Sequence, residues 1–268
     1  MTLVSTPFWQ GTDQMGRSLT LNTRPQRIVS LVPSQTELLF DLGLREEVVG
    51  ITKFCIHPAE FYKTTPKIGG TKQFKLEVIE QLQPDLILGN KEENYADGIY
   101  ALAEKYPVWM SDILNWQDAL AMIRTVGGLV GKTTQALAMA AEIEAQFASL
   151  SPLQPFRKAA YFIWRKPWMV AGGDTFINEM MQKIGLHNVF ASLPARYPAL
   201  SAEEMAAYSP EVVLLSSEPY PFQAKHIAEL QALFPKAQFQ LVDGEMFSWY
   251  GSRLLYAAKY LQNLQKYF

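Results

Sequence analysis

The sequence predicts an α/β protein of two lobes, with mostly parallel sheets, joined by one long helix. In both halves of the chain, short continuous apolar runs alternate with helical segments, which is typical of buried parallel strands and their crossover helices. Between Asp118 and Leu150, by contrast, no strand signal is present, and apolar residues recur at spacings of three and four. We therefore expect a first lobe over 1–116, connecting helices over 117–151 and a second lobe over 152–268.

Four apolar runs in the first lobe predict strands, and the segments between them predict helices. A loose hairpin is expected before them, up to Pro25, because turn residues flank a short alternating stretch. Ser34 and Glu37 have the S-x-x-E spacing of a capping box, so a helix is expected to begin there. Gly43 is expected to end that helix in the left-handed conformation. The expected strands are Arg27–Pro33, Val48–Thr52, Asp85–Asn90 and Pro107–Asp112, with further helices around Lys75–Gln83 and Asn94–Lys105.

The connecting region predicts two helices with a break near Gly127–Thr133. The second helix, of about 17 residues, would be roughly 25 Å long. The break contains GGLVGKTT, which is similar to a phosphate-binding loop. Val126 stands where that loop needs its first glycine, and a helix rather than a strand precedes it, so we interpret the stretch as a helix break. In the second lobe the expected strands are Lys158–Trp164, Val212–Ser217 and Phe239–Asp243, and the expected helices are Thr175–Ile184, Ser201–Ala207, Ala224–Leu233 and Ser252–Leu264.

The composition excludes several classes of protein. Of 268 residues, 49% are hydrophobic and 19% are charged, an ordinary soluble globular profile. The net charge of −2 gives no basic footprint for nucleic acid, so we expect no nucleic-acid partner. We also expect the chain to be a monomer. The apolar runs fall far short of the roughly 20 residues that a membrane-spanning helix needs. Because Cys55 is the single cysteine, no disulfide can form within the chain.

The opening segment, MTLVSTPFWQGTDQMGR, has neither the basic n-region nor the apolar h-region of a secretory signal. Two interpretations stay open. The protein is periplasmic or otherwise extracytoplasmic if a signal was removed, and it is cytoplasmic if Met1 is the native start.

A helix-to-strand unit is repeated, once in each lobe. FKLEVIEQLQPDLILGN begins at Phe74 and LSAEEMAAYSPEVVLLS begins at Leu200, and each runs from a helical pattern through Pro and an acid into an apolar run. A glutamate stands seven residues before the proline in both: Glu77 and Glu203. These are either first-turn acids favoured by the helix dipole or a matched pair of carboxylates for a two-fold partner carrying arginines or lysines.

Two polar loops of the first lobe contain candidate ligand contacts. Cys55 and His57 are two residues apart and could contact a ligand or its metal, act as nucleophile and base, or simply belong to a loop. No further metal-ligating residue is near them in the sequence. Glu92 lies just after the strand that ends at Asn90, where ligands of parallel sheets bind. Asn94, in the same loop, could instead cap the following helix.

Aromatic residues beside arginines follow two strands of the second lobe. IWRKPWMVAGGDT contains Trp164, Arg165 and Trp168, and MFSWYGSR contains Trp249, Tyr250 and Arg253. Large rings on polar, turn-rich loops suit a flat, partly anionic ligand, which they would stack on while the arginines pair its acidic groups. The alternative is that these rings pack between the loops and the lobe.

The chain resembles the cobalamin- and iron-chelate-binding branch of the substrate-binding proteins of ABC importers, whose lobes are joined by a single long helix. RIVSLVPSQTELLFDLG, PKIGGTKQFKLEVIEQLQPDLIL, LSAEEMAAYSPEVVLL and IWRKPWMVAGGDTFINEMMQKIGLHNVF carry the resemblance over essentially the full length. It implies a ligand in the cleft between lobes, a lobe rotation of only a few degrees on binding, and one permease-docking glutamate per lobe. Those glutamates fall on Glu77 and Glu203, with Glu204 adjacent to the second.

The resulting hypothesis is a non-enzymatic solute-binding protein that captures a metal chelate and delivers it to a permease dimer. The chelate is a cobalamin-like corrinoid, a ferric siderophore or haem, and we expect no intrinsic cofactor or metal. The alternatives are a cleft enzyme that uses Cys55 and His57, or a cytoplasmic metallocofactor carrier. The expected ligand contacts are Cys55, His57, Glu92, Trp164, Arg165, Trp168, Trp249, Tyr250 and Arg253.

Overall fold

The structure, a computed structural model, describes residues 6–268 and divides into two compact units. Unit 1 comprises the described residues up to Ile113, with Gln117–Glu142 and Tyr250–Arg253. Unit 2 comprises Leu114–Trp116, Ile143–Trp249 and Leu254–Phe268. The lobe boundaries expected at 116 and 151 stay predictions. Met1 and the residues up to Ser5, which begin the opening segment discussed above for a secretory signal, lie outside the described residues.

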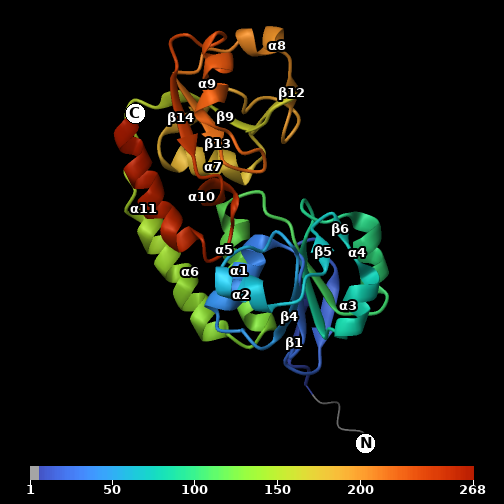
Figure 1. Cartoon of the computed structure of the whole chain (residues 1–268). Coiled ribbons are helices and arrows are strands. Elements are labelled where there is room, and N and C mark those ends of the chain that lie inside the picture. The colour runs from blue at the N-terminus through green and yellow to red at the C-terminus, as the bar shows by residue number, and fades with distance from the viewer. Residues whose placement is uncertain (1–5) are drawn as a thin grey trace, which may run out of the picture. The chain divides into compact units, whose positions relative to one another are not determined.

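Unit 1 is built on a four-stranded parallel sheet in the order β4-β3-β7-β8 (Figure 1). An antiparallel hairpin of β1 and β2 precedes it, as the sequence predicted, and a small hairpin of β5 and β6 stands apart from it. All four expected strands are present. The elements are β1 (Trp9–Thr12), β2 (Ser18–Leu21), β3 (Ile28–Ser30), α1 (Pro33–Asp41), β4 (Val48–Ile51), α2 (Ala59–Thr64), β5 (Gly69–Gly70), β6 (Gln73–Phe74), α3 (Leu76–Leu82), β7 (Leu86–Asn90), α4 (Ala96–Ala103) and β8 (Val108–Ser111).

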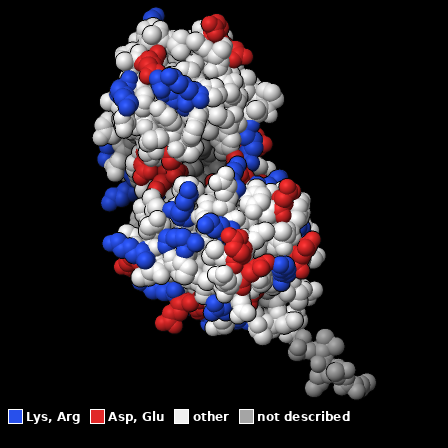
Figure 2. All heavy atoms as spheres, turned by 45° about the vertical axis from the view of Figure 1, so that its right-hand side comes forward, with Lys and Arg blue, Asp and Glu red and all other residues white. Residues whose placement is uncertain are grey.

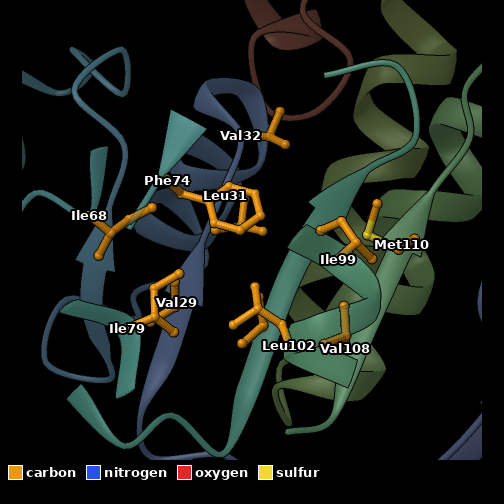
Figure 3. Close-up of a cluster of buried hydrophobic side chains, with 11 residues drawn as sticks. Val29, Leu31, Val32, Ile68, Phe74, Ile79, Ile99, Leu102, Val108 and Met110 are labelled. Atoms are coloured by element: carbon orange, nitrogen blue, oxygen red, sulfur yellow. The ribbon is translucent and has the colours of Figure 1, made fainter. Parts of the chain in front are cut away.

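The core of unit 1 lies between the parallel sheet and the helices α3 and α4 (Figure 3). Val29 from β3 and Val108 from β8 face Ile79 of α3 and Leu102 of α4. Strands that are covered by helices need apolar side chains on nearly every residue, which explains the continuous runs in the sequence. This packing holds the carboxyl ends of β3, β4, β7 and β8 at one edge, where the loops with candidate ligand contacts begin.

The long helix expected in the middle of the chain is α6 (Thr133–Ala148), which has 16 residues. It follows α5 (Trp116–Leu129), and the break between them contains Gly131 with a φ of +70°. A positive φ suits glycine, so GGLVGKTT is a helix break, as predicted. The residues of α6 up to Glu142 belong to unit 1 and those from Ile143 belong to unit 2.

Unit 2 contains a six-stranded mixed sheet. Its strands β9, β11, β13 and β14 are parallel to one another, β10 pairs with β9 in antiparallel fashion, and β12 pairs with β10 in antiparallel fashion at the edge. The sequence predicted β9, β13 and β14 but not the two- and three-residue strands. The elements are β9 (Arg157–Trp164), β10 (Trp168–Val170), α7 (Phe176–Lys183), β11 (Leu186–Asn188), β12 (Ala199–Leu200), α8 (Ala202–Ala206), β13 (Val212–Ser216), α9 (Ala224–Gln231), β14 (Gln238–Val242), α10 (Glu245–Ser248), α11 (Leu254–Leu264) and a 3₁₀ turn (Gln265–Tyr267).

The repeated sequence unit corresponds to a repeated set of hydrogen bonds at the start of the central strand pair. In unit 1 the Asp85 amide donates to the Arg27 carbonyl at 2.9 Å, and the Asp85 carboxylate accepts from the Arg27 amide at 2.8 Å. In unit 2 the Glu211 amide donates to the Lys158 carbonyl at 2.8 Å, and its carboxylate accepts from the Lys158 amide at 2.8 Å. The acid after each proline therefore fixes the register of two parallel strands.

Two expected helix caps of unit 1 are wrong. Helix α1 begins at Pro33, its N-cap is Val32, and no side chain caps it. Proline suits the first turn because its missing amide would have no partner there. The carboxylate of Glu37 binds Arg253 instead, while Gly43 does end the helix with a φ of +81°.

Asn94 is not the cap of α4 either, because α4 begins at Ala96 with Tyr95 as its N-cap. The Asn94 side chain is buried and accepts from the Asn90 amide at 2.8 Å. Its amide group donates to the carbonyls of Leu31 and Thr71, at 3.3 and 3.0 Å. Asn94 thus ties the ends of two strands to the β5–β6 hairpin.

The segment Tyr250–Arg253 is held on α1 of unit 1 by a largely buried ion pair. Arg253 Nη2 lies 2.7 Å from Glu37 Oε1, and the two side chains are 11% and 10% exposed. Gly251 has a φ of +146°, and a Cβ there would stand 3.0 Å from the Ser34 carbonyl oxygen. Burial raises the pKa of Glu37, and the nearby Arg253 only partly opposes this. Arg253, expected to pair with a ligand, is therefore already neutralised inside unit 1.

We predict opposite pH dependences for the two halves of this pair. Replacing one partner of a buried ion pair typically costs about 3–5 kcal/mol. A carboxyl whose pKa is raised on folding stabilises the fold at low pH, and this contribution is lost as the pH rises through its folded pKa. In Arg253→Met, Glu37 can take up a proton, so the loss of unfolding free energy should shrink as the pH falls from 8 to 5. Glu37→Gln removes the raised-pKa carboxyl itself, which stabilises the unsubstituted chain more at low pH, so the loss in this variant should grow as the pH falls from 8 to 5.

Denaturant unfolding of both variants and of the unsubstituted chain at pH 5 and 8 measures this difference. A loss for Arg253→Met that is equal at both pH values would contradict the buried ion pair.

Candidate functional site

Glu77 and Glu203 occupy the same position in equivalent helices. Each is the second residue of its helix, α3 and α8, and each is exposed. The neighbouring Glu204 closes a capping box: its carboxylate accepts from the Ser201 amide at 2.7 Å, and Ser201 Oγ accepts from the Glu204 amide at 3.2 Å. Hydrogen bonds from its own amide and from Ser201 lower the pKa of Glu203, which keeps that carboxylate ionised. Glu203, not the capping Glu204, is therefore the equivalent of Glu77.

An aromatic cluster lies at the carboxyl end of β9 and in the loop after β13 in unit 2. Trp164 ends β9 and is 38% exposed. Its ring meets that of Tyr220 edge-on at 5.7 Å, and Tyr220 in turn contacts Phe222 at 4.8 Å. Trp168 is more covered, since it stacks on Phe222 with an interplanar angle of 6°. Of the two tryptophans predicted here, Trp164 offers the more open ring.

Arg165 has an internal partner in the same cluster. Its guanidinium donates two hydrogen bonds to the Glu229 carboxylate of α9, at 2.8 and 2.9 Å. It also lies over the Trp168 ring, 5.9 Å from the centroid. The hydrogen bonds from Arg165 lower the pKa of Glu229, and those to Glu229 raise the pKa of Arg165, so both groups carry charge. A ligand that binds the expected Arg165 would share the guanidinium with this carboxylate, which accepts from two of its five N–H groups.

His226 connects the loop after β13 to the start of α9. It is buried, its Nδ1 accepts from the Gln223 amide at 2.9 Å, and its Nε2 lies 3.2 Å from the Tyr220 hydroxyl. Burial lowers the pKa of His226, and the charges of Lys225 and Arg165 act in the same direction. Both ring nitrogens are thus engaged within unit 2.

Trp249 and Tyr250 are not the exposed rings that the sequence predicted, since each is only 8% exposed. The Trp249 indole nitrogen donates to Glu218 Oε1 at 3.0 Å, and Ser248 Oγ donates to the same oxygen at 2.7 Å. Burial raises the pKa of Glu218, and these two hydrogen bonds oppose the rise. A polar, turn-rich loop can turn its rings inward when a buried carboxylate satisfies their polar atoms.

Cys55 is inside unit 1. Its Sγ lies 3.1 Å from the hydroxyls of both Thr36 and Thr52, and burial raises its pKa. A reactive cysteine needs an accessible thiolate, so this environment is that of a structural thiol. A ligand contact by Cys55 would require the loop to rearrange. His57 is half-buried and precedes a cis proline, Pro58.

The exposed apolar residues beside Cys55 were missed by the sequence analysis. Phe54 and Ile56 are 50% and 47% exposed, and the Lys53 ammonium lies 5.0 Å from the Phe54 ring centroid. They directly follow β4, so the rule that ligands bind at the carboxyl ends of parallel strands could have found them. The same rule would have found Tyr220, which follows β13. The carboxylate partners of the two arginines, the buried Glu37 and the exposed Glu229, carry no such signal.

Glu92 lies in the turn after β7 and is half-buried. The amides of Glu92 and Glu93 donate to Asn90 Oδ1 at 2.9 and 3.1 Å, which holds the turn at the sheet edge. Lys91 pairs with Asp112 at 2.6 Å. Within residues 6–268, no group of three or more His, Cys, Asp or Glu side chains is placed to hold a metal ion.

The structure brings the expected contacts together in two groups, one in each unit. Unit 1 contains Cys55, His57, Glu92, Tyr250 and Arg253, and unit 2 contains Trp164, Arg165, Trp168 and Trp249. The expected cleft between lobes and the small rotation on binding stay predictions, because they concern one unit against the other. Basic and acidic side chains are interspersed on the face shown in Figure 2. No helix among the described residues is both long and apolar enough to cross a membrane.

Comparison with known proteins identifies the family. The family model described as "Periplasmic binding protein" matches residues 28–233. A cobalamin-binding protein of Halobacterium salinarum is 27% identical over 209 residues, and the match covers 75% of this chain and 57% of that protein. A vitamin B12-binding protein of Pectobacterium carotovorum is 26% identical over 244 residues, covering 88% and 86%.

Solved structures with a similar fold are also periplasmic binding proteins. A periplasmic haem-binding protein of Roseiflexus sp. RS-1 superposes with a TM-score of 0.75 at 24% identity, covering 90% of this chain and 97% of that one. The chain spans somewhat more than half of the length of its Halobacterium relative, at 57%. Since the family model covers more than half of this chain, the chain belongs to the periplasmic binding protein family.

Proposed function

We propose that this chain is the solute-binding component of an ABC importer and that its ligand is a metal chelate, with a corrinoid such as cobalamin favoured over haem or a ferric siderophore. The observation that carries the proposal is the exposed Trp164 ring packed on the half-buried Tyr220 after β9 and β13, in a chain whose relatives are named for cobalamin binding. The chelate is cargo, not a resident cofactor, and the role is binding rather than catalysis.

Two of the side chains that could hold haem iron, His226 and Cys55, have partners within their own units, which favours a corrinoid. Haem iron in proteins is generally held by an axial His, Cys, Met or Tyr. In unit 2, both nitrogens of His226 are already used by Gln223 and Tyr220. In unit 1 the Cys55 thiol is buried between two threonine hydroxyls. A corrinoid brings the ligands of its own cobalt, so it needs ring contacts more than a bond from the protein to its metal.

The surfaces that could supply those contacts are apolar and aromatic. In unit 2 the exposed Trp164 lies beside the half-buried Tyr220, and Phe54 and Ile56 are exposed in unit 1. His57 lies in the same loop after β4 as Phe54 and Ile56. Glu92 follows β7, at the same edge of the sheet. Of the other expected contacts, Trp168 stays in the proposed set as a supporting ring. Cys55, Trp249, Tyr250, Arg165 and Arg253 are weaker candidates, because each is buried or has an internal partner.

The matched positions of Glu77 and Glu203 support an importer as the partner. Two exposed carboxylates at equivalent places of equivalent helices suit a permease dimer that repeats the same basic group twice. The two alternatives, a cleft enzyme and a cytoplasmic carrier, have less support. A cleft enzyme needs a reactive Cys55, which is buried with a raised pKa. A carrier without a transporter gives no reason for the matched acids.

We predict that Trp164→Ala weakens the binding of cyanocobalamin at least tenfold. A buried tryptophan contact is worth about 2 kcal/mol or more in binding, and 1.4 kcal/mol corresponds to a factor of ten. The measurement is an absorbance or calorimetric titration with cyanocobalamin, haemin and a ferric hydroxamate. Phe156→Ala is the matched control, because Phe156 is also exposed but precedes the other end of β9.

Two results would contradict the proposal. One is that the unsubstituted chain binds none of the three chelates. The other is that Trp164→Ala and Phe156→Ala bind with the same affinity as the unsubstituted chain.

We predict that the double variant Glu77→Gln, Glu203→Gln loses docking on a corrinoid importer in lipid nanodiscs but keeps its affinity for the chelate. Removing both carboxylates removes the charge-assisted hydrogen bonds to the partner and leaves the ligand surfaces intact. The matched control is Glu80→Gln, Glu204→Gln, which removes the same charge from the same two helices. Equal docking by the two double variants would count against Glu77 and Glu203.

A further inference from the structure

The tautomer of His226 follows from its hydrogen bonds. The backbone amide of Gln223 can only donate, so the Nδ1 atom that it meets at 2.9 Å must be the unprotonated nitrogen. The proton of the neutral imidazole is therefore on Nε2. Nε2 lies 3.2 Å from the Tyr220 hydroxyl, so His226 donates and the Tyr220 oxygen accepts.

This arrangement fixes the role of the Tyr220 hydroxyl. A phenol has one hydrogen and can accept as well as donate. Since the contact with His226 uses the oxygen as acceptor, the hydroxyl hydrogen points elsewhere. The guanidinium of Arg165, which also interacts with Tyr220, has only donors and so cannot receive that hydrogen either. The Tyr220 hydroxyl can therefore donate its hydrogen to a ligand. The contacts of its oxygen with His226 and Arg165 orient the hydroxyl.

The loop that carries Tyr220 is anchored on both sides. The Tyr220 amide donates to the Ile163 carbonyl of β9 at 3.3 Å, and the Phe222 amide donates to the Ser216 carbonyl at the end of β13 at 3.2 Å. The Tyr220 ring meets the exposed Trp164 ring at 5.7 Å. A donor on a fixed loop beside an open ring suits a ligand with a flat face and an oxygen at its rim.

We propose that Tyr220 is a specificity-determining residue that donates a hydrogen bond to a carbonyl or carboxylate oxygen at the rim of the bound chelate, and that His226 is its positioning residue. The inference rests on the proposed function, and it adds which chemical group the site selects. Carboxamides at the rim of a corrinoid and carboxylates at the rim of haem both offer such an oxygen, so the experiment uses both.

The first test compares Tyr220→Phe with the unsubstituted chain in titrations with cyanocobalamin and with haemin. We expect about tenfold weaker binding of at least one chelate, as for a lost hydrogen bond to a buried group. Loss with cyanocobalamin alone identifies a carboxamide as the acceptor, and loss with haemin alone identifies a carboxylate. Tyr256→Phe is the control, because Tyr256 is an exposed tyrosine of α11. Melting temperatures establish that all variants fold.

The second test separates positioning from helix capping at His226. An asparagine there can keep an acceptor near the Nδ1 position for the Gln223 amide but cannot reach Tyr220. A glutamine can keep a donor near the Nε2 position but gives up the acceptor. We expect His226→Asn to lose affinity to about the level of Tyr220→Phe, and His226→Gln to bind close to normally despite a lower melting temperature. A purely structural His226 would give affinities that follow stability instead.

The outcomes distinguish this inference from the proposed function. If the unsubstituted chain binds neither chelate, both fail. If it binds and Trp164→Ala weakens binding while Tyr220→Phe stays within twofold for both chelates, the role of Tyr220 is wrong and the proposed function stands. Affinity that falls in Tyr220→Phe and does not fall further when His226→Asn is added supports both roles.

Discussion

Parallel strand pairing is the constraint on which the rest of the molecule depends. In each unit the central strands begin with a carboxylate that accepts from the backbone of the neighbouring strand: Asp85 from Arg27, and Glu211 from Lys158. With register fixed there, the carboxyl ends of the parallel strands meet at one edge. The loops after β4 and β7 in unit 1, and after β9 and β13 in unit 2, therefore share an edge within their own unit. Residues far apart in the sequence, such as Trp164 and Tyr220, become neighbours.

Internal pairing of charge shapes what those edges can offer to a ligand. Arg253 is neutralised by Glu37, Arg165 by Glu229, and Glu218 is covered by the Trp249 indole. A buried charge without a partner is far more costly than a paired one, so the buried Arg253 is a poor anchor for an anion, while the more exposed Arg165 would have to share its guanidinium with Glu229. The open rings and apolar side chains at these edges, Trp164, Phe54 and Ile56, stand beside exposed lysines such as Lys53 and Lys166. Such a surface offers a large planar chelate both apolar contact and cations for an acidic rim.

The sequence was sufficient for the fold but only in part for the site. Continuous apolar runs, Pro and Gly positions and the strand-free middle predicted every long strand and the long connecting helix. Residue type could not tell whether a ring on a polar loop faces out, as for Trp164, or in, as for Trp249, because a distant carboxylate decides this. The S-x-x-E pattern at Ser34 failed for the same reason: Glu37 finds a stronger partner 216 residues away. Sequence patterns reflect interactions between residues that are close in the sequence. The orientation of Trp249 and the partner of Glu37 depend instead on contacts with residues far along the chain.

The matched glutamates are different, because their equivalence is a property of each unit alone. Position two of a helix that leads through Pro and an acid into a central parallel strand has a defined place relative to that strand. Glu77 and Glu203 both hold that position. In unit 2 Ser201 caps the helix and forms hydrogen bonds with Glu204. Of the two adjacent acids, Glu203 is therefore the one that corresponds to Glu77. A helix with an ordinary first-turn acid would need no such match in a second unit. A partner that presents the same basic group twice would require it.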